Sequence, residues 1–259
     1  MTRAGKRRAW KASLLLALVA AGAMAISTAT AQVVKSGNLQ IEIEGGFSPT
    51  ALPKKKHAPI TLEVEGSMET LDGTHVPATK EIYLEFDRNG KLNTKGLASC
   101  TVGKLQSTLT NQAKSACPKA LIGTGRVTAE IALPEQRPFS AGGPLLIFNG
   151  SKGRKQELIF HVYANVPAPT TVVTTAKIGK AKGPYGTSAR VKVPSITSGQ
   201  GSLTSFKAKL KKSWRTKGRK QNLLLARCPS GRLRARGDIK FVNGSKLSGT
   251  IVKPCRPKG

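Results

Sequence analysis

The chain has 259 residues, with 43 Lys and Arg against 13 Asp and Glu, and its formal net charge is +30. The whole chain has three His, and only one acidic side chain lies after residue 176. Few groups are therefore present for acid–base chemistry, which disfavours a hydrolase and favours a non-enzymatic protein. The excess of positive charge indicates a polyanionic partner instead.

Residues 1–31 are predicted to form a secretory signal peptide. The stretch has basic residues between Arg3 and Lys11, an apolar run at 14–26 and the cleavage signature Ala29-Thr30-Ala31. The apolar run is too short for a transmembrane helix, and no second run of membrane length follows. We expect a secreted protein, released or held noncovalently at the cell wall, with the general secretion and twin-arginine routes both open.

Cleavage after residue 31 would leave 228 of the 259 residues. This length suits a single all-β domain over 32–259, with a possible boundary near 134–138 if the chain instead forms two small domains. Apolar and polar residues alternate at 39–44, 60–65, 81–86 and 127–133, a pattern typical of half-buried antiparallel strands.

Turn signals agree with the strands. Asn-Gly pairs at 89–90, 149–150 and 243–244 favour tight hairpin turns between strands. A short helical excursion is expected near 101–116, where Leu105, Leu109 and Ala113 are spaced four apart. The expected fold is therefore an all-β antiparallel sandwich-like structure or a partly open barrel, with this one helical excursion.

Four cysteines in an exported chain favour two disulfides. Three pairings can be drawn. Cys100–Cys117 with Cys228–Cys255 is the simplest, because each pair closes a local loop. A zinc site is disfavoured because no C-x-x-C is present and the histidines are scattered, so no metal or cofactor is expected.

Positive charge is concentrated in the last third of the chain. Residues 32–176 hold 16 basic and 12 acidic side chains, whereas residues 177–259 hold 22 basic side chains and one acid. Two predicted strands, around 203–214 and 233–241, alternate apolar and cationic residues, and a cationic turn follows the first. If these strands were neighbours, about six cations would share one sheet face.

The candidate ligand-binding residues are the cations of these two segments. They are Lys207, Lys209, Lys211, Arg215, Lys217, Arg219, Lys220, Arg234, Arg236 and Lys240. The expected partner is an anionic polymer of the cell wall or envelope, bound in a salt-dependent manner. Nucleic acid is disfavoured by the compartment and by the scarcity of nearby aromatic side chains. The competing interpretation is a solvated face whose lysines protect an edge strand.

No catalytic motif is found. His161, in the apolar strand candidate 157–163, is a weak candidate for a general base, and a hydrogen-bonded structural histidine is the competing interpretation. With a nearby carboxylate, His161 would favour an exported carbohydrate-active hydrolase. A carrier of an apolar ligand inside a partly open barrel is a third alternative.

Several segments together resemble those of a known protein family. They are Phe47-Ser48-Pro49-Thr50-Ala51-Leu52-Pro53, Cys117-Pro118-Lys119-Ala120-Leu121-Ile122-Gly123, Phe148-Asn149-Gly150, His161-Val162-Tyr163 and Pro184-Tyr185-Gly186-Thr187. The pattern resembles a family of exported proteins of high-GC Gram-positive bacteria to which no activity is assigned. The resemblance implies a secreted bacterial β protein and carries no catalytic residue to this chain.

Overall fold

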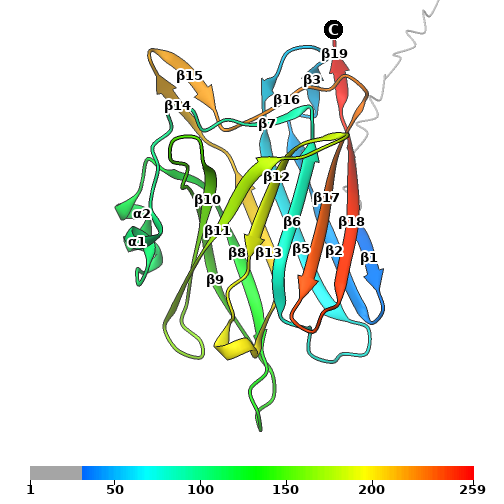
Figure 1. The fold of residues 1–259 in the computed structure, drawn as a ribbon, viewed down its shortest axis with the longest axis vertical. Helices are drawn as coiled ribbons and strands as arrows, with labels where there is room; N and C mark the ends of the chain where they lie inside the picture. Colours follow the sequence, from blue (N-terminus) through cyan, green and yellow to red (C-terminus); the bar gives the residue numbers. More distant parts are fainter. Residues whose placement is uncertain (1–30) are drawn as a thin grey trace, which may run out of the picture.

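The computed structural model describes residues 31–259, so the predicted signal peptide lies outside the described residues except for Ala31. An antiparallel sheet of 12 strands dominates the fold (Figure 1). In spatial order the strands are β1 (Gln32–Ser36), β2 (Leu39–Ser48), β5 (Thr61–Thr70), β13 (Gly201–Leu210), β8 (Leu121–Ile131), β9 (Phe139–Asn149), β10 (Gln156–Ala164), β11 (Thr170–Lys180), β12 (Tyr185–Lys192), β6 (Thr79–Asp87), β17 (Arg232–Phe241) and β18 (Lys246–Pro254).

The sheet curls until its first and last strands meet, which makes it nearly barrel-shaped. Ser36 Oγ of β1 donates a hydrogen bond of 3.2 Å to the Lys246 carbonyl of β18. Gly249 leaves room for this approach, because a Cβ there would lie 2.8 Å from Val34 Cγ2. No strand pairing joins β1 to β18 within residues 31–259, so the barrel stays open along this seam. The all-β prediction is confirmed, in its partly open barrel form.

Successive side chains along each strand point alternately into the barrel and out of it, so every second residue fills the interior. On β10, Leu158, Phe160 and Val162 join the main apolar core. The residues between them face outward, where Ile159 packs under a cover of two helices. The segment predicted as a possible domain boundary, 134–138, lies in the turn between the paired strands β8 and β9.

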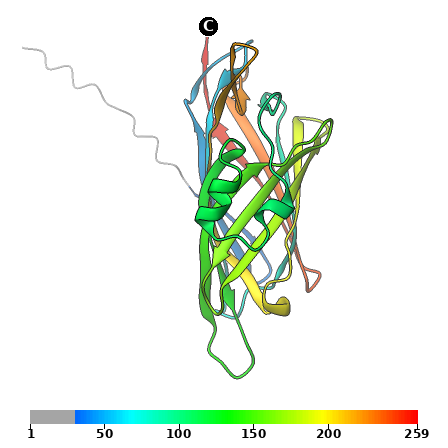
Figure 2. The ribbon, with the colours of Figure 1, turned by 90° about the vertical axis from the view of Figure 1, so that its left-hand side faces the viewer.

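The expected helical excursion consists of two helices, α1 (Val102–Leu105) and α2 (Thr110–Ala116). They lie against the outer wall of the barrel (Figure 2). Leu105 is fully buried there, whereas Leu109 precedes α2 and is 46% exposed, so the spacing of four residues does not put Leu109 inside a helix. The disulfides Cys100–Cys117 and Cys228–Cys255 confirm the predicted pairing.

Only one Asn-Gly pair makes the expected hairpin turn. Asn243-Gly244 connects β17 to β18, and Gly244 adopts a φ of +88°, which glycine tolerates best. The other two pairs have different roles. Asn89 accepts a hydrogen bond of 2.9 Å from Arg227 Nε. Asn149 is buried and donates one of 2.9 Å to the Ala98 carbonyl.

Shorter elements gather at one end of the barrel, which is uppermost in Figure 1. Strand β3 (Ala51–Pro53) pairs in parallel with β19 (Arg256–Lys258), and β16 (Leu224–Ala226) pairs with both β4 (Ala58–Pro59) and β7 (Gly90–Leu92). β14 (Ser213–Thr216) and β15 (Arg219–Asn222) form a separate hairpin. The short 3-10 helix η1 (Thr197–Gly199) lies before β13 at the opposite end of the barrel (Figure 1).

Candidate polyanion-binding surface

Six connecting segments meet at this end of the barrel. Because neighbouring strands are antiparallel, successive connections alternate between the two ends. The segments at the β19 end are 49–60, 88–101, 150–155, 181–184, 211–231 and 255–259. Backbone hydrogen bonds join several of them: Cys228 N donates to Pro53 O at 2.9 Å, and Arg256 N donates to Thr50 O at 2.9 Å.

Charge is divided sharply between the two ends. The six segments contribute three, three, three, one, seven and two Lys or Arg, nineteen in all, and no Asp or Glu. The connections at the opposite end contain Arg137 as their one Lys or Arg, together with Asp72 and Glu135. We call the group of six segments the cationic end.

The β14–β15 hairpin stands at the upper left of the barrel in Figure 1. Arg215 lies opposite Lys220 in the register, so both cations share one face. The other face of the hairpin is anchored, because Trp214 Nε1 donates a hydrogen bond of 3.2 Å to the Lys95 carbonyl. Lys217 lies in the turn and is exposed, as is Arg219.

Five of the ten candidate residues lie at the cationic end, and none of these five forms an ion pair within residues 31–259. They are Lys211, Arg215, Lys217, Arg219 and Lys220. All five are exposed. A row of unpaired, solvated cations keeps its full attraction for a polyanion, since no local carboxylate neutralises it.

The other five candidates have carboxylate partners along the barrel strands. The pairs are Lys207–Glu65 at 2.6 Å, Lys209–Glu63 at 2.6 Å, Arg234–Asp87 at 3.8 Å, Arg236–Asp238 at 3.2 Å and Lys240–Glu81 at 3.2 Å. The hydrogen bond from Lys209 lowers the pKa of Glu63, and the hydrogen bond to Glu65 raises the pKa of Lys207. Asp87 and Glu81 are largely buried beside their cations, whereas Glu63 and Glu65 are exposed, and every one of these pairs reduces the charge available to a ligand.

The two cationic strands are not neighbours. β13 lies between β5 and β8, whereas β17 lies between β6 and β18. The shared face of about six cations, which depended on their pairing, is therefore not formed. The predicted strand at 203–210 is part of β13, and the predicted hairpin with a cationic tip is β14–β15. This hairpin follows Leu210 but is not part of the 12-stranded sheet.

Sequence reasoning missed most of the cationic end. Its remaining cations come from segments far apart along the chain: Lys54, Lys55, Lys56, Arg88, Lys91, Lys95, Lys152, Arg154, Lys155, Lys182, Lys212, Arg227, Arg256 and Lys258. A signal for them was present in the sequence, because every second connection between predicted strands lacks Asp and Glu. Antiparallel strands bring these alternate connections to the same end of the sheet.

His57 lies among these cations. Partial burial, together with the positive charges of Arg227 and Lys91, lowers its pKa. The imidazole is therefore neutral at neutral pH, and its titration reports on the positive potential of the cationic end.

His161 is completely buried between β10 and the helical excursion. Its Nε2 lies 2.9 Å from the Thr108 carbonyl oxygen and 3.1 Å from Thr108 Oγ1. Its Nδ1 has no hydrogen-bond partner within residues 31–259, and neither nitrogen bonds a carboxylate there. This geometry is that of a structural histidine that ties the segment between α1 and α2 to the barrel.

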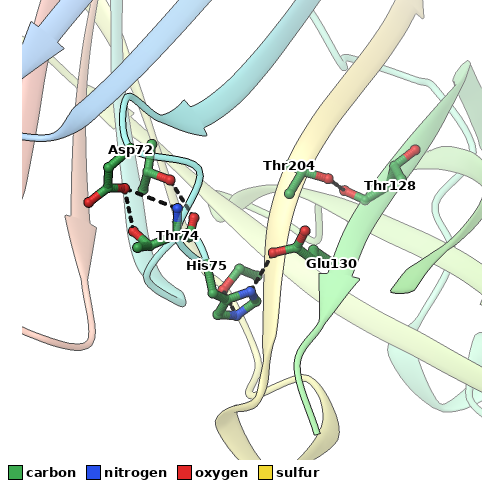
Figure 3. Close-up of polar contacts among 8 residues, drawn as sticks. Asp72, Thr74, His75, Thr128, Glu130 and Thr204 are labelled. Atoms are coloured by element: carbon green, nitrogen blue, oxygen red, sulfur yellow. Dashed lines mark hydrogen bonds and ion pairs between the residues drawn. The ribbon is translucent and has the colours of Figure 1, made fainter. Parts of the chain in front are cut away.

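A polar cluster at the opposite end was not predicted. His75 Nδ1 lies 2.5 Å from Glu130 Oε1, and Ser202 Oγ lies 3.1 Å from His75 Nε2. Figure 3 shows His75 beside Glu130, and within the same segment Asp72 receives a 2.6 Å hydrogen bond from Thr74. The hydrogen bond from the Thr74 side chain is the largest of several that lower the pKa of Asp72.

The order serine, histidine, glutamate is that of a nucleophilic triad. Ser202 has no exposed surface, however, so a substrate carbonyl has no access to Oγ in this structure. The cluster instead fastens the 71–78 connection to β8 and β13, whose residues Glu130 and Ser202 face each other in the register.

Pockets open to solvent lie on two parts of the surface formed by residues 31–259. One, of about 330 Å³, lies at the cationic end and is lined by Arg88 and Arg234 and also by Asp87, the partner of Arg234. The other, of about 520 Å³, lies on the outer face of β8, β9 and β10. Residues 31–259 contain no helix long and apolar enough to cross a membrane, and no group of three metal-ligating side chains.

No family model, curated protein or solved structure matches the chain.

Proposed function

We propose that the protein works outside the cytoplasm and binds an anionic polymer of the cell wall or envelope through its cationic end. The observation that carries the proposal is the meeting of six segments with nineteen cations and no acidic side chain at one end of the barrel. Two disulfides support an oxidising compartment.

The arrangement favours a polymer over a small anion. The cations are spread over the β14–β15 hairpin, the segment with Lys54 to Lys56 and the C-terminal strand β19, rather than converging on one atom. A flexible chain of phosphates or carboxylates can contact several of these segments at once and release the counterions that each had held. Binding then depends steeply on salt and little on the sequence of the polymer.

Retention of oxidised protein 32–259 on immobilised polyphosphate tests the proposal. We expect tight retention at about 50 mM salt and release by about 200 mM, as for polyelectrolyte contacts in general. Replacing Arg215, Lys217, Arg219 and Lys220 by Gln should flatten the slope of log affinity against log salt by about three units, since each contact contributes about 0.7.

A charge-matched control separates this surface from net charge. Lys207→Gln, Lys209→Gln, Arg236→Gln and Lys240→Gln together remove the same four charges from the barrel strands, where each is paired with a carboxylate. This variant should keep most of the salt slope. Equal losses in both variants would show that binding follows net charge alone and would overturn the assignment to the cationic end.

A further inference from the structure

The outer face of β8, β9 and β10 carries a second concave surface, well separated from the cationic end. The groove measures about 520 Å³, within the range of small-ligand sites. It lies below α2, whose first residue Thr110 borders it, and above the β8–β9 turn. Besides Thr110, its polar side chains are Arg126, Thr128, Ser140, Tyr163 and Asn165.

Part of the floor of the groove is bare backbone, at Gly142. Gly142 lies opposite Thr128 in the β8–β9 register, on the outward-facing side. A Cβ at Gly142 would collide with the Val127 carbonyl oxygen, so the strands approach too closely for a larger residue. A flat ring can therefore rest directly on this part of the sheet.

Polar groups around the floor lack partners inside the protein. Within residues 31–259, the side chains of Arg126, Ser140, Tyr163 and Asn165 form no hydrogen bond or ion pair. Glu130, which neighbours Ser140 across the ladder, is occupied by His75. Arg126 is thus the one charged side chain that lines the groove, and no carboxylate competes for it.

We propose that this groove binds one or two rings of a saccharide that carries a carboxylate. Tyr163 supplies an aromatic face beside the floor, and sugar rings present apolar C–H faces to such rings. Arg126 receives the carboxylate, since its guanidinium matches carboxylate geometry and is always charged. Ser140, Thr128 and Asn165 provide donors and acceptors for ring hydroxyls.

Binding of trigalacturonate and of its neutral counterpart galactotriose tests the groove, measured by calorimetry at constant salt. The variant Arg215→Gln, Lys217→Gln, Arg219→Gln, Lys220→Gln serves as background, because it removes the exposed cations of the β14–β15 hairpin, and Arg126→Gln within it isolates the charge of the groove. We expect the acidic trisaccharide to bind about tenfold more tightly than the neutral one. Arg126→Gln should abolish that preference, whereas Arg137→Gln, the same change on an exposed turn, should leave it intact.

Tyr163 is tested in the same background. Tyr163→Ala should weaken both trisaccharides about tenfold, and Tyr163→Phe should retain most of the affinity because the ring remains. Thermal unfolding of each variant verifies that the fold persists. The proposal is overturned if neither trisaccharide binds at about 10 mM, or if both bind equally, or if affinity survives Tyr163→Ala. These outcomes are independent of polyphosphate retention, so the proposal for the groove and the proposal for the cationic end are tested separately.

Discussion

Removing the Cys228–Cys255 disulfide should both destabilise the protein and weaken its binding of polyanions. The bond joins the 211–231 and 255–259 segments, and the backbone around it is tied to the segment with Pro53. Cys228 is fully buried beside Leu52, so the disulfide also holds the small apolar cluster under the cationic end.

The magnitude follows from the separation of 27 residues. In the loop-entropy model a loop of this size contributes about 3.5 kcal/mol. For a domain of this size each kcal/mol moves the melting temperature by about 2–4 °C, so Cys228→Ala with Cys255→Ala should melt about 7–14 °C lower. Polyphosphate retention at low salt should fall as well, because the two segments no longer hold a fixed arrangement.

The matched control is Cys100→Ala with Cys117→Ala. That loop spans 17 residues, and the same model gives about 3 kcal/mol, close to the value for the first pair. It lies under the helical excursion, so the variant should be destabilised without losing retention at a temperature where it is folded. The reasoning is refuted if the Cys228–Cys255 variant loses less than about 1 kcal/mol, or if the two variants lose retention equally.

Three further predictions concern histidines. Polyphosphate should raise the pKa of His57, measured by NMR titration, because it offsets the positive charges of Arg227 and Lys91; an unchanged pKa would place the polymer elsewhere. Without the polymer, the unfolded chain takes up this proton more readily, so stability should rise with pH through the window just below the ordinary histidine range and then level off. His75→Ala should lower the free energy of unfolding in urea by about 1–3 kcal/mol, because it leaves the buried Ser202 hydroxyl without its partner. Polyphosphate retention should stay the same. An esterase activity that is present in the wild type and lost in this variant would instead support a catalytic role.

Local signals in the sequence determined much of the fold. Period-two alternation identified β2, β5, β6 and β8, because one face of each strand is buried whatever its neighbours are. The pairing of the cysteines followed from short loop closure, and the helical excursion from apolar spacing between Cys100 and Cys117. The Asn-Gly signal succeeded only at Asn243-Gly244, since Asn89 and Asn149 serve contacts to distant segments.

The candidate surfaces were decided by tertiary structure. Charge counted along the chain pointed to the last third, yet Lys207 and Lys209 are held by carboxylates of β5, more than 100 positions away. Lys54 and Arg256, which the charge count separated, meet at the same end through the parallel β3–β19 pair. The physical reason is that composition fixes how many charges a chain carries, whereas strand direction and order fix which of them meet, because antiparallel pairing sends alternate connections to opposite ends of the barrel.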